Sequence, residues 1–186
     1  MTDAGYLPKV IVATPDGLTV KRVREICSVS HCISPTVEQW LSTWRHNDFG
    51  WFNCIEDAWA VVPEPERARY RLFAYRVAPV RFRKGERLPV SVPENAHPVA
   101  IPSSFVSLGF DGVSKSMESA QGFECSPLSC NAMAGEVRAN EHCLFATIEA
   151  AIEGAESFSR QEPESGDYYV VEVLEERITE GRRTSE

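Results

Sequence analysis

The sequence predicts a single α+β domain, in which a twisted sheet, mixed or mostly antiparallel, carries three to four helices. The chain has 186 residues, a length that suits one domain with its own hydrophobic core. Hydrophobic residues make up 43% of the chain and charged residues 25%, a balance typical of a folded protein rather than of a disordered one. A pattern of strand, helix and strand occurs twice along the chain, which favours helices packed on a sheet.

The first 50 residues predict one strand and two helices. The β-branched run Lys9–Thr14 predicts a short strand that ends at a Pro-Asp-Gly turn. Residues 18–28 have apolar side chains at helical spacing. A Ser-Pro pair indicates the start of a second helix, Pro35–His46. Trp40 and Trp44 lie on the apolar stripe of that helix, so we expect both to be buried.

Two similar units follow. In chain order they are strand, helix and strand over residues 51–54, 55–62 and 70–77, and again over residues 143–146, 148–158 and 168–173. The helices begin alike, with Ile55-Glu-Asp-Ala58 in one unit and Ile148-Glu-Ala-Ala151 in the other. Thr147 is expected to cap the second helix. The likeness indicates either an internal duplication or two solutions to one packing problem.

The segments between and after these units complete the predicted domain. Four prolines make residues 88–102 an edge strand or a connecting loop, because proline cannot donate a backbone hydrogen bond. Residues 105–113 resume a strand pattern, and Pro127 begins a short helix that ends near Gly135. We place the domain at residues 1–174 and expect residues 175–186 to be a frayed, charged tail.

Charge is distributed unevenly, although the whole chain is acidic with a formal net charge of −8. A basic strip between Arg67 and Arg87 contains eight basic residues and one acidic residue, Glu86. Charge runs are more often solvated or internally matched than ligand sites. We therefore expect no nucleic-acid binding, and we expect Arg76 to meet a carboxylate such as Glu172.

The sequence also predicts the compartment and the metal content of the protein. No apolar run is long enough to span a membrane, and the N-terminus has no secretory signal pattern, so a cytoplasmic protein without membrane contact is expected. In that compartment the six cysteines are expected to be free thiols. A zinc site was weighed for Cys125, Cys130, His142 and Cys143. Adjacent strand residues point to opposite faces, so His142 and Cys143 would not share one ion, and we expect neither a metal nor another cofactor.

The segment from Glu124 to Asn131 has the densest group of polar and reactive side chains, which is typical of a functional loop. A helix dipole near Pro127 favours two cysteines as catalytic candidates, Cys125 and Cys130. The binding candidates in the segment are Ser126, Ser129 and Asn131. The alternative is that the serines are helix caps.

Aromatic residues provide a second candidate site. All four tryptophans lie between residues 40 and 59. Most of this group is expected to be core, since aromatic side chains dominate burial, but Trp51 and Trp59 could instead stack on a base or a nicotinamide ring. The sequence has no Gly-rich phosphate loop and no Gly-x-Ser-x-Gly elbow.

Residues 51–77, with a helix opening on Glu56-Asp-Ala58, and residues 108–113, Leu-Gly-Phe-Asp-Gly-Val, resemble small ADP-ribosyltransferase-like domains. The resemblance implies an enzyme that acts on a nicotinamide dinucleotide, with Trp51, Trp59 and Glu172 at its site. Asn53 and Cys54 stand where that family has a Ser-Thr-Ser type strand.

Two classes of function therefore remain open. The first is a non-catalytic binding or accessory protein with an unknown protein or small-molecule partner, which the lack of a clear catalytic motif favours. The second is the ADP-ribosyltransferase-like enzyme. A pocket that contained both Glu172 and the segment Trp51–Cys54 would favour the enzyme, whereas their placement on opposite sides of the sheet would favour the binding protein.

Overall fold

The computed structural model of the chain describes residues 1–10, 12–13, 23–30, 46–90, 99–115, 123, 125–130, 133–161 and 166–177. Four sequence predictions fall outside these residues. They concern the turn at residues 15–17, Asn131, the tail beyond residue 177 and residues 35–45, which include Trp40 and Trp44. The side chain of Cys130 also lies outside the description.

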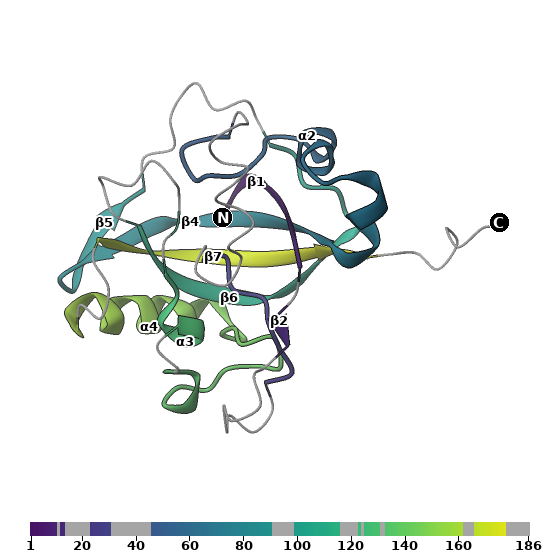
Figure 1. Ribbon diagram of the computed structural model, residues 1–186. Coiled ribbons are helices and arrows are strands. Elements are labelled where there is room, and N and C mark those ends of the chain that lie inside the picture. Colours follow the sequence, from purple (N-terminus) through teal and green to yellow (C-terminus); the bar gives the residue numbers. More distant parts are fainter. Residues whose placement is uncertain are drawn as a thin grey trace.

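An antiparallel sheet forms the centre of the molecule (Figure 1). Its four long strands lie in the order β1 (Thr2–Lys9), β4 (Arg71–Arg83), β7 (Asp167–Glu176) and β6 (Phe105–Lys115). The short strand β5 (Glu86–Pro89) pairs with the second half of β4 at the sheet edge. The predicted α+β class with a mostly antiparallel sheet is confirmed. β7 continues through Glu176, two residues beyond the predicted domain end.

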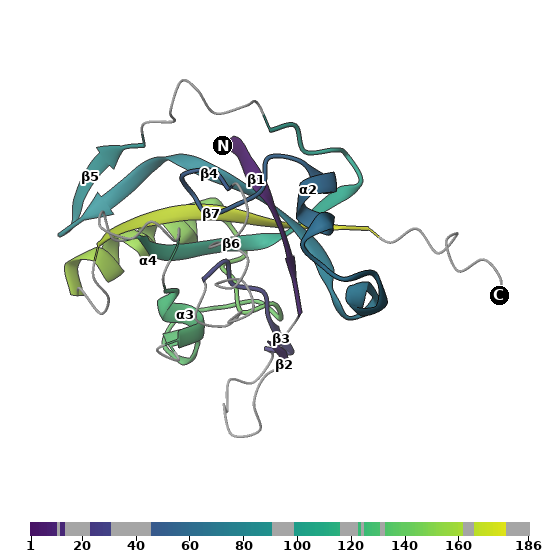
Figure 2. The same ribbon diagram turned by 45° about the horizontal axis from the view of Figure 1, so that its top comes forward.

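Helices cover the sheet on one side and at one end. The longest is α4 (Ile148–Gln161), which packs against β4, β6 and β7. It begins where the Ala150 N–H donates to Thr147 Oγ1 over 3.2 Å, the predicted cap. α2 (Ile55–Ala60) contacts β1 (Figure 2). α3 (Pro127–Cys130) is shorter than predicted and is followed by a separate 3-10 turn. No helix among the described residues has the length and apolar character needed to cross a membrane.

Two core clusters pack on the sheet, and the larger one includes residues from both of its faces. Because successive strand residues point to opposite faces, Tyr75 and Val77 lie on one face with Val171 and Val173, beneath Trp51. On the other face, α4 covers a second cluster made of Ala78, Val80, Phe82, Tyr168, Val170, Phe145 and Phe158. The candidate site and the polar core described below lie on the Tyr75 face.

The two halves of the sheet are built alike. Tyr75 of β4 and Val173 of β7 are partners at the centre, and each pairs outward with a glycine. These glycines, Gly5 of β1 and Gly109 of β6, lie at bulges with φ of 149° and 138°. A Cβ at either glycine would come within 3 Å of a backbone carbonyl oxygen, that of Phe52 or that of Phe145. Glycine is therefore required twice, for the same reason.

Each half also contains the same asparagine-centred loop before its helix. Asn47 donates through Nδ2 to the Ala4 carbonyl at 2.7 Å, and Asn140 donates in the same way to the Leu108 carbonyl at 2.7 Å. Each asparagine side-chain oxygen accepts two backbone N–H bonds from its own loop. This correspondence supports the duplication interpretation over that of two unrelated packing solutions.

Three secondary-structure predictions are wrong. The predicted helix over residues 18–28 is not helical where it is described, and contains strand β3 (Glu25–Ile26), which pairs with β2 (Val12–Ala13). The predicted strands at 51–54 and 143–146 reduce to single bridges, at Phe52 and Phe145. In both places backbone N–H groups of the loop donate to the asparagine side chain, Asn47 or Asn140, and not to a neighbouring strand.

Candidate functional site

A loop at one edge of the sheet positions His142. Asn140 Oδ1 accepts the N–H groups of His142 at 2.9 Å and of Leu144 at 3.1 Å, which fixes the loop conformation. Phe145 exchanges two backbone hydrogen bonds with Phe110 of β6, which joins the loop to the sheet. Cys143 has a φ of 59°, in the left-handed region, and lies at the tight turn of this loop.

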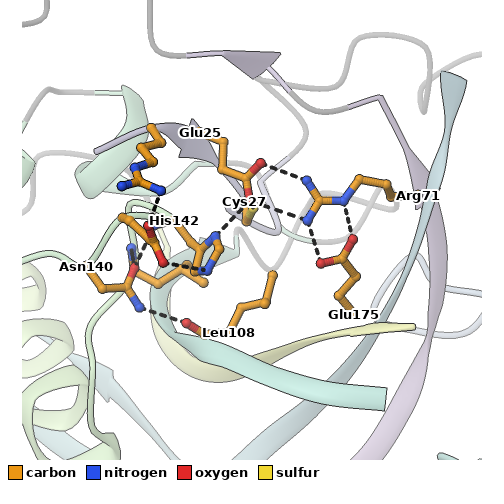
Figure 3. Close-up of polar contacts among 10 residues, drawn as sticks. Glu25, Cys27, Arg71, Leu108, Asn140, His142 and Glu175 are labelled. Atoms are coloured by element: carbon orange, nitrogen blue, oxygen red, sulfur yellow. Dashed lines mark hydrogen bonds and ion pairs between the residues drawn. The ribbon is translucent and has the colours of Figure 1, made fainter. Parts of the chain in front are cut away.

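The strand β3 lies beside this loop. The Glu141 carbonyl accepts the N–H groups of Arg24 and Glu25, and the His142 carbonyl accepts the N–H of Cys27 at 3.1 Å. These bonds make residues 24–27 extended, although apolar spacing predicts a helix there. In an extended segment Glu25 and Cys27 project to the same side. Both therefore face His142 (Figure 3).

A network of charges surrounds Glu25. Arg71, the first residue of β4, donates to Glu25 Oε2 at 2.7 Å and also holds both carboxylate oxygens of Glu175 on β7. His142 Nδ1 lies 2.7 Å from Glu25 Oε1. Burial alone would raise the pKa of Glu25, but the hydrogen bonds from Arg71 and His142 outweigh it and lower that pKa. Glu25 is therefore ionised at neutral pH.

Cys27 completes the cluster from the buried side. Its Sγ lies 3.5 Å from Glu25 Oε1, and its side chain is fully buried. Burial, with the negative charge of Glu25, strongly raises the pKa of the Cys27 thiol. A nucleophilic cysteine needs the opposite environment, one that stabilises the thiolate. The cluster is therefore poorly suited to cysteine nucleophilic catalysis.

The same three side chains offer a donor set for a metal ion. The ligand atoms of Glu25, Cys27 and His142 all lie within 4.8 Å of one another, and no other such trio occurs among the described residues. The Glu25 and His142 side chains are 22% and 23% exposed, so solvent reaches one side of the cluster. Carboxylate, thiolate and imidazole together suit a zinc-like ion. We call these three residues the Glu-Cys-His cluster.

Next to this cluster is a buried polar network centred on Asp111 of β6. The Asp111 carboxylate accepts hydrogen bonds from Ser28 Oγ at 2.6 Å, Ser126 Oγ at 2.7 Å and the Val29 N–H at 3.3 Å. Lys9, also buried, donates to the Ser28 carbonyl. Burial raises the pKa of Asp111, and the hydrogen bonds only partly offset this. The network joins four chain segments inside the core, where its members are almost fully shielded from solvent.

The predicted functional loop contributes to this network from the inside. Ser126 and Cys125 are buried, and α3 begins directly after them. Ser129 Oγ donates to the Ser126 carbonyl at 3.2 Å, a bond within the helical turn. For Cys130 the structure gives only the backbone, and Asn131 is not described. The hydroxyls of Ser126 and Ser129 thus both donate to acceptors within the protein.

The aromatic candidates lie in or against the core. Trp51 is fully buried and stacks on Tyr75 with ring centroids 4.5 Å apart, and Trp59 is partly buried against the same cluster. Trp51 Nε1 and the Tyr75 hydroxyl have no hydrogen-bond partner within the described part of the chain. Glu172 lies elsewhere, 3.2 Å from Arg76 in an ion pair that also includes Asp3. The predicted pairing of Arg76 with Glu172 is confirmed.

Sequence reasoning missed the Glu-Cys-His cluster because its members are far apart in the chain. Glu25 and His142 are 117 residues apart, and the first was assigned to a helix. The usable signal is the alternation of Cys27 and Val29 with Ser28 and Ser30, which is a short strand pattern. Of the zinc set weighed from the sequence, only His142 belongs to this trio.

Comparison of the chain with protein-family models, with curated proteins and with solved structures finds no match. The proposals below therefore rest on the geometry of the chain itself.

Proposed function

We propose that the protein is a non-catalytic binding protein whose ligand contacts the Glu-Cys-His cluster and its partner Arg71. One observation favours this class over an ADP-ribosyltransferase-like enzyme, namely the separation of Trp51 from Glu172. Trp51 stacks on Tyr75, whereas Glu172 pairs with the next residue of β4, Arg76. Neighbouring residues of a strand point to opposite faces, so the sheet lies between the tryptophan and the carboxylate.

The state of Glu172 points in the same direction. Its side chain is 12% exposed and its carboxylate is bound to Arg76, which is held in turn by Asp3. A catalytic carboxylate has to reach the reacting sugar, and breaking this ion pair would leave a partly buried guanidinium with one partner fewer. The geometry assigns Glu172 to joining β1, β4 and β7.

The raised pKa values of two buried cysteines also argue against a reactive thiol. Burial raises the pKa of Cys143 to about 12 and raises that of Cys27 as well. Both stay protonated at neutral pH, so neither is primed as a nucleophile. None of the four cysteines whose side chains the structure describes forms a disulfide, namely Cys27, Cys54, Cys125 and Cys143. Free thiols fit the reducing cytoplasm, where we propose that the protein acts.

The basic strip supports a partner other than nucleic acid. Four arginines of β4 form ion pairs with carboxylates: Arg71 with Glu25 and Glu175, Arg76 with Asp3 and Glu172, and Arg81 and Arg83 with Asp167. Matched charges attract phosphates weakly. We therefore propose a small ligand or a protein as the partner.

The test is an assay of nicotinamide release from NAD⁺ by the purified chain, the reaction expected of the enzyme class. We expect no release above that of the buffer. The decisive variants are Glu172→Gln and its matched control Asp3→Asn, since both carboxylates bind the same arginine. Release by the native chain that Glu172→Gln abolishes and Asp3→Asn keeps would refute the non-catalytic proposal.

A further inference from the structure

We infer that the Glu-Cys-His cluster is a binding site for one thiophilic divalent cation, of which Zn²⁺ is the natural probe. The inference rests on the proposed function, because it names the ligand class of the same site. It stands on the convergence of three different donor types from two chain segments. Glu25 and Cys27 come from the β3 segment and His142 from the loop before α4 (Figure 3).

The donor spacing fits a four-coordinate ion with small movements. Tetrahedral zinc with ligand distances of about 2.0–2.3 Å places neighbouring donors roughly 3.4 Å apart. Cys27 Sγ already lies 3.5 Å from Glu25 Oε1. His142 Nδ1 lies 2.7 Å from the same oxygen, at hydrogen-bond distance. On binding, the ion would take the place of the proton between these two atoms, and the atoms would move slightly apart. The fourth position faces the exposed side, where water completes the set.

The surroundings already orient the donors. Arg71 donates to Glu25 Oε2 at 2.7 Å and to Oε1 at 3.3 Å, which fixes the carboxylate with Oε1 near the thiol and the imidazole. On the far side of the ring, His142 Nε2 lies 3.9 Å from a carboxylate oxygen of Glu141. Metal-bound histidines usually direct their second nitrogen to a carboxylate or carbonyl acceptor, and Glu141 is near enough to take this role after moving closer to the ring, because the present distance is longer than a hydrogen bond. The Cys27 N–H bond to the His142 carbonyl keeps both segments together.

The charges balance when the ion is bound. Glu175 neutralises Arg71 through its own ion pair, so the guanidinium does not oppose a cation as a free positive charge would. Coordination displaces the Cys27 proton to solvent, and the resulting thiolate with the Glu25 carboxylate supplies two negative charges to the divalent ion. A buried charge is tolerated when it is paired in this way.

The loop asymmetry between the two halves of the fold is an independent pointer to a ligand. Phe49 and His142 occupy equivalent positions, each donating its N–H to the asparagine at the start of its loop. Phe49 packs into the aromatic core, beside Trp51 and Phe123. In the second half the same position holds an imidazole directed at a carboxylate and a thiol, which packing alone does not require.

The test is titration of chelator-treated protein with ZnCl₂ by calorimetry, followed by CoCl₂ as a spectroscopic probe. We expect one ion per chain and a thiolate-to-cobalt charge-transfer band. Cys27→Ser should abolish the band and lower zinc affinity by at least the roughly 10–100-fold that loss of a supporting group costs. Cys54→Ser is the matched control, because Cys54 lies outside the cluster, and it should bind as the native chain does.

Two further variants keep the result interpretable if Cys27→Ser fails to fold. Glu25→Gln keeps the size of the side chain and should weaken zinc binding, and His142→Ala should do the same. Absence of stoichiometric zinc binding by the native chain would overturn the inference, as would binding that survives Cys27→Ser and is lost in Cys130→Ser. Neither outcome bears on nicotinamide release, so failure of the metal site and failure of the non-catalytic proposal are separable.

Discussion

Replacement of Ser126 by alanine should destabilise the protein strongly, because the hydroxyl of Ser126 serves the folded core. Ser126 Oγ donates to Asp111 at 2.7 Å, and both residues are fully buried. The change removes one of the donors that the structure describes for a buried carboxylate, beside Ser28 Oγ and the Val29 N–H.

The expected magnitude follows from the charge of the acceptor. A hydrogen bond to a charged group contributes about 1.5–3 kcal/mol to the free energy of unfolding. For a chain of this size, 1 kcal/mol shifts the unfolding midpoint by about 2–4 °C. Ser126→Ala should therefore lower the midpoint by roughly 3–12 °C.

Ser129→Ala is the matched control, three residues further along the same segment. Ser129 Oγ donates to a neutral carbonyl, that of Ser126, from a half-buried position. Its loss should cost about 1 kcal/mol or less. Urea denaturation of both variants measures the difference. A Ser126→Ala variant within about 0.5 kcal/mol of Ser129→Ala would refute a structural role for Ser126 and restore the loop as a binding site.

The pH dependence gives the same prediction a second, independent readout. Burial raises the folded-state pKa of Asp111, so its stabilising contribution is complete below the unfolded pKa of about 3.9 and is lost as the pH rises through the folded value. The Ser126 bond lowers that folded pKa, and removing it raises the pKa further. The cost of Ser126→Ala should therefore be larger at pH 7 than at pH 4. An equal or larger cost at pH 4 would contradict the assignment of the bond to the ionised carboxylate.

Two other perturbations test the packing of α4 and the basic strip. Gly154→Ala should gain about 1 kcal/mol of helix propensity but lose about 1–3 kcal/mol to overpacking, because the new methyl would press on the Phe145 ring. At Gly135 an added methyl would meet no atom of the described residues within 4 Å, so Gly135→Ala should be neutral or slightly stabilising in the same thermal assay. A stabilised Gly154→Ala would show that the ring can move away. The strip between Arg67 and Arg87 should not bind a short DNA duplex at low salt, whereas micromolar binding that falls steeply with salt would show unmatched arginines.

The elements that sequence predicted well are those in which local and tertiary preferences agree. α4 has a cap at Thr147 and an apolar stripe that packs on the sheet, so both signals give the same helix. β7 is rich in valine and tyrosine, and the β4 arginine strip has an apolar second half, so both were predicted as long strands. An element can be predicted from sequence when its local propensity and its tertiary packing favour the same secondary structure.

The elements that sequence predicted wrongly are fixed by distant partners. Glu25 and Cys27 lie in a stretch with helical spacing, yet their N–H groups bond to the carbonyls of Glu141 and His142. Those carbonyls are in position only because Asn140 has shaped the loop, and Asn140 is docked through Leu108. The conformation of residues 24–27 thus depends on contacts with residues more than 100 positions away, which no local sequence pattern records. The extended conformation and the cluster that it creates could therefore not be predicted.

The similar construction of the two halves of the sheet explains why a site arises at this edge. Both halves need the asparagine and the outer-strand glycine, since these hold the loop against the sheet. The residues between them are free to differ, because each loop fixes its own backbone through the asparagine side chain. In the first half these residues include Phe49 and Trp51, which extend the aromatic core. In the second half His142 meets Glu25 and Cys27, so the same scaffold presents ligand atoms where its counterpart presents rings. The double variant His142→Phe with Cys143→Gly, which changes the second loop toward the first, should therefore keep the fold and remove the zinc site. Loss of folding instead would show that the two loops are not equivalent scaffolds.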